Sequence, residues 1–426
     1  MIAGHLSDAD RLAAGLRVLP ETAQAFAAAQ AAWRFYSNPA LSLPVLAEPL
    51  IEAAKVGVRE MCRDYALMVL DWSLLHYKHH VSKSDRIELA NHQDLGYKLL
   101  TALAVSDTTG WPLAPVCLEL EALDGLHTTR RRKPLAALSA LDGLGPVMEH
   151  VEKLQLERPL VWIIDREGDS IKHVREWVAA GRNFVVRADD APRVVCANRT
   201  QPLCEAAKQV PLVRTREVSH KGVPVLQYVG ETQIIIQRPA RTHRVVNGKP
   251  QHQNIAGPPI TLRLIVSEVR DSKGQVLARW LLLSNLPAEV SAEKIALWYY
   301  WRWKIESYHK LLKQAGQHLE SWQQDDAEQL SRRLAVVAMA AVLVWQLAHD
   351  QRAEAEQMRQ VLVRLSGRQM KRGKEQPGFT EPALLAGMGI LLPMLHLLET
   401  HSPDELKRLA CQVLPGTWSL PSEETG

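Results

Sequence analysis

The residues best suited to chemistry in this 426-residue chain are three carboxylates in very different surroundings. Asp71 follows the apolar run 66–70, and Asp165 follows the apolar run 160–164. Glu306 lies much later, in an aromatic and basic segment. Carboxylate oxygens are the ligands that hard divalent cations prefer, and several of them can hold metal ions for phosphoryl transfer. The chain therefore offers a candidate Asp-Asp-Glu metal site.

Each of these residues also has an ordinary structural explanation. Asp165, in the segment DREGD, could be a turn or helix-capping residue, although Asp169 is the better candidate to cap the helix that follows. Asp71 could be a polar residue of an edge strand. A lone Glu among basic residues on a helix usually belongs to a solvated, ion-paired face. The three residues are therefore convincing only as a set.

The segment that contains Glu306 predicts one amphipathic helix with a chemical face. At about 100° per residue, Tyr299, Arg302 and Lys313 fall within about 40° of Glu306. An apolar ridge suited to a protein core lies about 100–160° away, and comprises Trp301, Ile305, Tyr308 and Leu312. We expect this helix, part of a stretch from Ser291 to about Gln317, to be buried on one side and functional on the other.

Composition sets wide bounds on the class of protein. The net charge of +4, from 51 Lys+Arg and 47 Asp+Glu, is too small to indicate a nucleic-acid partner by itself. Five scattered cysteines without a CxxC pair argue against a disulfide framework or a structural zinc site. The apolar run 334–345 is shorter than the ~20 residues that cross a bilayer, and the N-terminus lacks a secretory signal. We expect a cytoplasmic protein without a membrane span.

The order of predicted elements indicates an α/β core. Residues 1–60 read as a helical unit interrupted at Pro39 and Pro44. Strands are predicted where the apolar runs 66–70 and 160–164 end in Asp71 and Asp165. Further strands are expected around 97–105 and 112–120, and a helix at 135–156.

Residues 185–285 are strand-rich and predict a β insertion. We expect a catalytic domain at 61–350 and a helical C-terminal region at 351–426.

Together these residues resemble a known family. The spacing Tyr299-x2-Arg302-x3-Glu306-x6-Lys313 matches, residue for residue, the YREK signature of the insertion-sequence-four family of DDE transposases. Similar segments extend over most of residues 30–350: WRFYSNPALS at 33–42, Asp71 in D-x-S-x-L-x-Y form, DREGD at 165–169, FVVR at 184–187 and RWLLLS at 279–284.

The resemblance implies an RNase H-like fold with a mixed-sheet catalytic core. It implies that Asp71, Asp165 and Glu306 are catalytic and hold two Mg²⁺ ions, with Mn²⁺ as a substitute. The carboxylates are 94 and 141 residues apart in sequence, which leaves room for the β insertion between Asp165 and Glu306.

The resemblance also implies a set of DNA contacts. Tyr299, Arg302 and Lys313 would hold phosphates near the cut end, with Arg187 as a further DNA-binding residue. Trp280 resembles the tryptophan on which a flipped base stacks, and it could otherwise be a strand-core residue. The implied partners are the inverted repeats at transposon ends, target DNA and a second subunit, contacted through the C-terminal helices, in a bacterial, nucleoid-associated homodimer.

The leading interpretation is thus a cut-and-paste transposase. A catalytically silent, inhibitory derivative is an alternative, because only Arg11 and Arg17 supply positive charge before Trp33. A general RNase H-like nuclease is another, although it leaves the Tyr-Arg-Lys stripe unexplained. The basic segments 128–134 and 238–244 could follow a DNA backbone or could be solvated loops.

Overall fold

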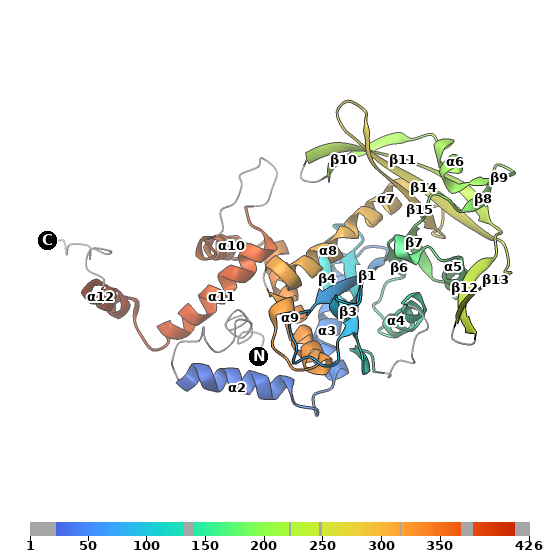
Figure 1. The fold of residues 1–426 in the computed structure, drawn as a ribbon. Helices are drawn as coiled ribbons and strands as arrows, with labels where there is room; N and C mark the ends of the chain where they lie inside the picture. The colour runs from blue at the N-terminus through green and yellow to red at the C-terminus, as the bar shows by residue number, and fades with distance from the viewer. Residues whose placement is uncertain are drawn as a thin grey trace. The chain divides into compact units, whose positions relative to one another are not determined.

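The computed structural model describes residues 23–131, 140–220, 223–246, 249–315, 317–367 and 378–413. The protein is a mixed α/β protein with a large 13-stranded mixed sheet and a helical C-terminal region (Figure 1). It forms two compact units. The larger contains Ala32–Lys310 and Gln324–Ala338, and the smaller contains Leu311–Gln323, Met339–Gly426 and the chain up to Ala31.

The centre of the sheet has the strand order β4-β3-β1-β6-β7. These strands are β1 (Ala66–His76), β3 (Leu95–Ser106), β4 (Pro112–Ala122), β6 (Leu160–Ile164) and β7 (Asn183–Arg187). Strands β1, β3 and β4 pair antiparallel, whereas β6 pairs parallel with both β1 and β7. The apolar runs at the start of β1 and throughout β6 suit strands that are covered on both faces.

The sheet continues from β7 through the strands of the predicted insertion, in the order β15-β14-β11-β8-β9. Their bounds are β8 (Arg193–Cys196), β9 (Arg199–Pro202), β11 (Val223–Ile236), β14 (Ile260–Arg270) and β15 (Val276–Ser284). Strands off this path are β2 (Ile87–Glu88), β5 (Gly125–Thr128) and β10 (Val213–His220), and a separate hairpin joins β12 (Ala240–Val246) to β13 (Lys249–Ile255). Residues 185–285 are therefore strand-rich, as predicted.

Helices cover the central strands of the larger unit. Helix α3 (Leu43–Met61) packs on β4 and β3, and buries Leu43, Ala47, Leu50, Ala54 and Val58 at helical spacing. Pro44 lies in its first turn and does not interrupt it, because a proline is tolerated where backbone N–H groups have no helical partner. The remaining helices are α4 (Leu144–Glu152), α5 (Ile171–Ala179), α6 (Leu203–Lys208), α7 (Ala292–Trp301) and α8 (Trp303–Lys310), with 3₁₀ turns η2 (Leu141–Gly143) and η3 (Arg166–Gly168). The predicted helix 135–156 falls partly outside the described residues.

The smaller unit is helical. It contains a π-helical turn (Leu311–Ala315), η5 (Leu319–Ser321), α10 (Ala353–Leu365), α11 (Glu381–Leu398) and α12 (Pro403–Val413); α2 (Ala23–Tyr36) and α9 (Ala327–His349) each belong to both units.

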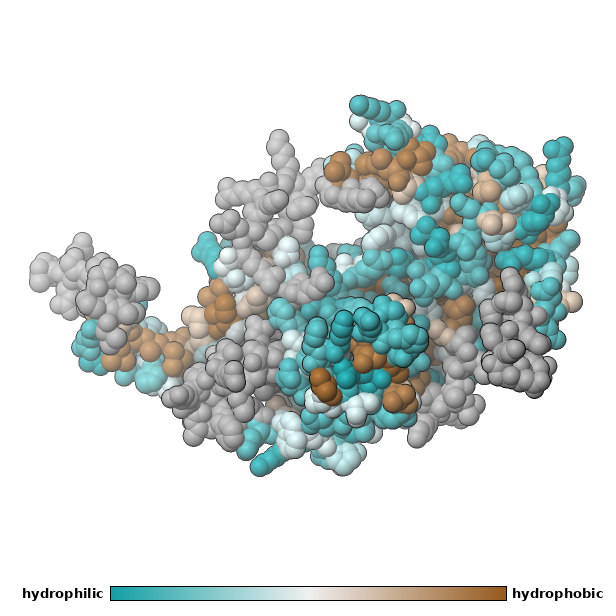
Figure 2. Space-filling view, viewed as in Figure 1, coloured by the Kyte–Doolittle hydropathy of each residue, from teal (hydrophilic) through white to brown (hydrophobic). Residues whose placement is uncertain are grey.

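Among the described residues, two helices, α9 and α11, are long and apolar enough to cross a membrane, and their apolar windows are 78% and 22% buried. Figure 2 shows apolar side chains at the surface of α11, where Ile390, Met394 and Leu395 are exposed. A buried core helix of a soluble protein passes the same test as α9, so the expected absence of a membrane span stays a prediction.

Candidate active site

Asp71 and Asp165 lie side by side at the C-terminal end of the parallel strand pairing. The pairing of β1 with β6 ends at Leu70 and Ile164, and the two aspartates are the residues that directly follow these. The prediction that the first strand ends at Asp71 is wrong. Strand β1 continues to His76 because all of it pairs with β3, and Asp71 there faces Thr101. The register alone thus brings two of the three predicted carboxylates together.

The loop after β6 shows what each of its acidic residues does locally. Asp165 caps the 3₁₀ turn η3, and its Oδ1 accepts a hydrogen bond from the Glu167 backbone N–H at 2.8 Å. The prediction that Asp169 caps the following helix is wrong, since Ser170 holds the N-cap position of α5. The Asp169 carboxylate instead accepts a hydrogen bond from the backbone N–H of Asp189 at 2.8 Å.

The segment around Glu306 is not the single helix that was predicted. Helix α7 ends at Trp301, α8 begins at Trp303, and a π-helical turn follows at Leu311. At the junction, backbone bonds span three residues, from Arg302 N–H to the Tyr299 carbonyl and from Ile305 N–H to the Arg302 carbonyl. Such bonds tighten the backbone and interrupt the α-helical ladder.

The boundary between the two compact units, after Lys310, divides the predicted stripe. Tyr299, Arg302 and Glu306 belong to the larger unit, whereas Lys313 belongs to the smaller unit. There the Lys313 ammonium forms an ion pair with Glu320 at 3.1 Å. Of the predicted core ridge, Ile305, Tyr308 and Leu312 are buried.

Arg302 joins two of the carboxylates. Its side chain is buried, and its Nη1 lies 3.1 Å from Asp71 Oδ2 while its Nη2 lies 2.5 Å from Glu306 Oε1. The planar guanidinium has donors in a fixed fork, which suits simultaneous pairing with two carboxylates. Asp71 on β1 and Glu306 on α8 are therefore held to one cation.

The protonation behaviour of Asp71 reports the proximity of all three carboxylates. Burial raises the pKa of Asp71 to about 6, the Arg302 charge lowers it, and the charges of Asp165 and Glu306 raise it. A carboxylate shifted by burial and by like charges is common at functional sites. Asp165 and Glu306, remote in sequence, thus both act electrostatically on Asp71.

Two aromatic residues flank this cluster. Tyr299 is buried, and its ring centroid lies 6.4 Å from that of Trp280 on β15. Burial raises the pKa of the Tyr299 hydroxyl, and the charges of Arg302 and Arg187 oppose that rise. Trp280 is 9% exposed, so it is packed within the fold and yet reaches the surface. Arg187, the last residue of β7, is thus close enough for its charge to influence the Tyr299 hydroxyl.

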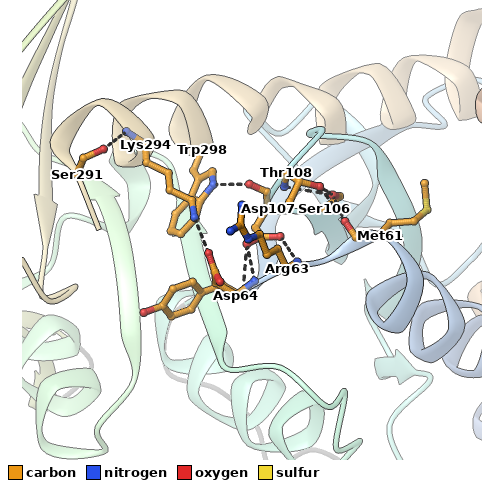
Figure 3. A network of polar contacts seen from close by, with 10 residues as sticks. Met61, Arg63, Asp64, Ser106, Asp107, Thr108, Ser291, Lys294 and Trp298 are labelled. Atoms are coloured by element: carbon orange, nitrogen blue, oxygen red, sulfur yellow. Dashed lines mark hydrogen bonds and ion pairs between the residues drawn. The ribbon is translucent and has the colours of Figure 1, made fainter. Parts of the chain in front are cut away.

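Sequence reasoning missed Asp107, which fixes the elements that carry the site. Its carboxylate accepts backbone hydrogen bonds from Arg63 at 2.8 Å, Asp64 at 3.0 Å and Tyr65 at 3.1 Å, just before β1. Its carbonyl accepts the indole N–H of Trp298 on α7 at 3.0 Å, and Figure 3 shows the residue between these elements. Only the turn-like segment SDTTG signalled this position.

A second contact supports the same arrangement. Lys294 on α7 donates to Asp64 at 2.9 Å and lies over the Trp298 ring, 5.1 Å from its centroid. Together with Asp107, this ion pair ties the start of β1 to α7.

The structure describes part of each of the two basic segments, 128–134 and 238–244. Arg130 is buried and ion-paired with Glu119, and Arg131 pairs with Glu48 at 3.3 Å, so these arginines have structural partners. Arg130 therefore has a structural role inside the fold, and DNA contact by this segment stays a prediction. Residues 132–134 and the side chains of 241–244 lie outside the described part of the chain.

Within the described ranges, no three His, Cys, Asp or Glu residues stand as a ready metal-binding group. The donor set of Asp71, Asp165 and Glu306 consists of carboxylate oxygens, which fit a hard cation. In this arrangement Arg302 supplies the positive charge between two of them. The sequence matches no protein-family model.

Proposed function

We propose that the chain is a DNA transposase of the insertion-sequence-four family of DDE transposases, an enzyme that cuts transposon ends and joins them to target DNA. The observation that carries the proposal is that strand register places Asp71 beside Asp165, while Arg302 pairs with both Asp71 and Glu306 of α8. The charges of Asp165 and Glu306 also raise the pKa of Asp71, which supports a shared role.

The topology supports an RNase H-like core. Three antiparallel strands, β4, β3 and β1, are followed in the sheet by two parallel strands, β6 and β7. The two aspartates then lie at neighbouring strand positions, as such a core requires. The strands from β8 to β15 fall between Asp165 and Glu306, where the family resemblance puts an insertion.

The three carboxylates are the residues that would hold two Mg²⁺ ions, with Mn²⁺ as a substitute. Two such ions stabilise the attacking and leaving oxygens of an in-line displacement at phosphorus. Because Arg302 pairs with Asp71 and Glu306, its guanidinium must exchange these carboxylates for another anion when a cation binds. A phosphate of the DNA strand is the natural replacement partner for a guanidinium fork.

The other predicted residues act on the strand itself in this proposal. Tyr299, Arg302 and Lys313 hold phosphates, and Arg187 adds positive charge beside Tyr299. Trp280 supplies an aromatic face for an unstacked base.

The reaction begins with hydrolytic nicking, which frees a 3′-hydroxyl. That hydroxyl attacks a phosphodiester of the opposite strand, which forms a hairpin and releases the flanking DNA with a 3′-hydroxyl. Water then hydrolyses the hairpin phosphodiester and restores the 3′-hydroxyl of the transposon end. This hydroxyl attacks a phosphodiester of the target DNA and displaces a target 3′-hydroxyl.

The partners in the proposal are double-stranded DNA and a second subunit. The substrate DNA carries the element's inverted repeats, and the helices of the smaller unit contribute to a synaptic homodimer. The protein acts in the bacterial cytoplasm, on nucleoid DNA.

The test is cleavage of duplexes that carry the inverted repeats flanking the gene. The purified chain should produce a nick at the repeat end and then a hairpin, in Mg²⁺ but not in EDTA. Unrelated duplexes should give neither product. Equal degradation of unrelated DNA would instead identify a general nuclease. Binding without any cleavage would identify a silent, inhibitory derivative.

A further inference from the structure

A concave surface in the larger unit gathers arginines beside the candidate active site. It encloses about 600 Å³ and lies among η3, the segment after β7, the β11–β12 connection and β15. The charged residues that line it are Arg166, Arg187, Arg238, Arg279, Asp189 and Asp190. We refer to this surface, defined by these residues, as the arginine cleft.

Positive charge in the arginine cleft exceeds what the protein neutralises. Arg166 forms an ion pair with Asp189 at 3.3 Å. Arg187, Arg238 and Arg279 make no ion pair and no side-chain hydrogen bond with any residue that the structure describes. The Nε atom of Arg238 is shielded from solvent and has no hydrogen-bond partner there. Since shielded donors are normally satisfied, the Arg238 guanidinium, with Arg187 and Arg279 lining the same surface, points to an anionic ligand.

The electrostatic neighbours of the arginine cleft strengthen this assignment. Arg279 lies close enough to Lys208 of α6 for the two positive charges to repel. Lys208 is ion-paired with Glu205 at 2.7 Å. Arg238 acts on the buried carboxylate of Asp169 and lowers the pKa that burial raises. Asp189 and Asp190 are the opposing charges in the lining, so an anion would have a restricted position rather than a diffuse one.

The arginine cleft is separate from the aromatic pair of the active site but adjoins it. Neighbouring residues of a strand point to opposite faces, so Arg279 and Leu281 share the face opposite Trp280. The ring of Trp280 packs on its own side against Tyr299. Arg166 directly follows Asp165, which places one end of the arginine cleft next to the carboxylate cluster.

We infer that the arginine cleft binds a phosphodiester segment of the DNA strand that flanks the cleavage point. Guanidinium forks match phosphate oxygens in a bidentate manner, and the apolar lining from Pro192 and Leu281 suits a sugar. The identity of the ligand as DNA rests on the proposed function. The anionic character of the ligand rests on the arginines alone.

The test is the salt dependence of DNA binding by the full chain, without divalent cations. A fluorescent 20-mer duplex of arbitrary sequence is titrated between roughly 50 and 200 mM NaCl, a range over which lost phosphate contacts change affinity strongly. The variant Arg238→Gln/Arg279→Gln should bind about tenfold more weakly at low salt. The slope of log affinity against log salt should be smaller in magnitude by about 2. The reason is that two phosphate contacts are lost and each contributes about 0.9 to the slope.

Two matched variants separate the arginine cleft from general charge and from folding. Arg59→Gln/Arg352→Gln removes the same charge from exposed arginines that are paired with Glu157 and Asp350, and it should keep the wild-type slope. Arg238→Lys/Arg279→Lys keeps the charge and should restore most of the slope.

A wild-type slope in the Arg238→Gln/Arg279→Gln variant, or an equal loss in the Arg59→Gln/Arg352→Gln control, would overturn the inference. So would a wild-type chain that does not bind the duplex at all. Failure of the proposed function alone gives a different result, a chain that binds DNA through the arginine cleft without cutting it.

Discussion

Asp71 and Asp107 show how one residue type serves function at one position and the fold at another. Burial of Asp71, together with the charges of Asp165 and Glu306, outweighs its ion pair with Arg302, so its ionised form is destabilised. The Asp107 carboxylate accepts three backbone N–H groups before β1. The same Asp→Asn change should therefore have opposite effects on stability at the two positions.

Asp71→Asn should increase the free energy of unfolding at pH 7.5 in EDTA. The folded pKa of about 6 lies above the ordinary 3.8, so the folded protein binds an extra proton between these pH values. The free energy of unfolding consequently falls as pH rises through this window. Above the window Asp71 is ionised in the folded protein, and its full unfavourable free energy is present. At 1.36 kcal/mol per pKa unit, Asp71→Asn should recover roughly 1–3 kcal/mol.

Asp107→Asn should lower the free energy of unfolding by about 1–3 kcal/mol, because its amide cannot accept all three N–H groups. Urea denaturation of both variants measures the pair of effects. A destabilised Asp71→Asn protein would contradict the assignment of Asp71 as a functionally strained residue.

Arg302 should compete with metal ions for the carboxylates. In Arg302→Gln, removal of the charge beside Asp71 and Glu306 should strengthen Mn²⁺ binding to the DNA-free protein severalfold, as measured by electron paramagnetic resonance. Cleavage should nevertheless fall, because the phosphate loses its guanidinium partner. The charge-preserving Arg302→Lys variant should bind Mn²⁺ about as wild type does. Equal Mn²⁺ affinity in all three proteins would show that Arg302 does not occupy the cation position.

At the scale of elements, the junction between α7 and α8 depends on close packing at Gly110. This glycine has φ +69°, and a Cβ atom there would lie 2.3 Å from the ring of Trp301, the last residue of α7. Gly181 has the same φ of +69° but nothing within 4 Å of its Cβ position. The two glycines therefore separate backbone strain from steric overlap.

Gly181→Ala should lower the free energy of unfolding by about 1–2 kcal/mol, because the only unfavourable change is an alanine in the left-handed backbone conformation. Gly110→Ala should cost a further 1–3 kcal/mol or so, because Trp301 must move. It should also slow cleavage, since Arg302 follows Trp301 directly. Thermal unfolding and a nicking assay measure the two effects. Equal losses in the two variants would mean that Trp301 yields without consequence.

Sequence patterns predicted the elements whose own residues determine them. The run 160–164 was predicted as a strand with the bounds that β6 has, because it is apolar throughout and lies between Pro159 and Asp165. Strands β9, β12 and β13 were not predicted individually, since their polar sequences carry no strong alternation and depend on their pairing partners. The four-residue β8 is apolar in part, but it is too short to show a pattern.

The break at Arg302 was also missed, because helical periodicity continues on both sides of it.

The candidate site was partly predictable for the same reasons. Glu306 and Arg302 share a helical stripe, so their ion pair follows from a spacing of four residues. The adjacency of Asp71 and Asp165 depends on strand register, which no local pattern reveals. Asp107 acts through backbone groups 42 to 44 residues away, and nothing in the turn SDTTG specifies those partners.

At the scale of the whole molecule, Lys83 should dominate one part of the dependence of stability on pH. Its side chain is almost completely buried, and its ammonium donates to the Gln324 carbonyl. Burial lowers the pKa of Lys83 from 10.5 to about 8, against the opposing charges of Asp325, Asp85 and Asp326.

Between pH 8 and 10.5 the unfolded chain binds a proton that the folded protein has released, so stability rises with pH. Relative to Lys83→Met, the wild-type protein should gain about 2 kcal/mol between pH 8 and pH 10, measured by urea denaturation. Lys153→Met, at an exposed position, should follow the wild-type curve. Parallel curves for wild type and Lys83→Met would contradict this account.

The most direct test of the central claim is the rate of first-strand nicking by variants of the carboxylate cluster, measured on pre-bound end duplexes in Mg²⁺. Asp165→Asn should lower the rate by about 10³-fold or more, as loss of a group that stabilises the transition state does, while DNA affinity stays within a few fold. Asp124→Asn, at an exposed aspartate outside the carboxylate cluster and the arginine cleft that pairs with His127, should nick at close to the wild-type rate. Full nicking activity in Asp165→Asn would contradict the proposed transposase active site.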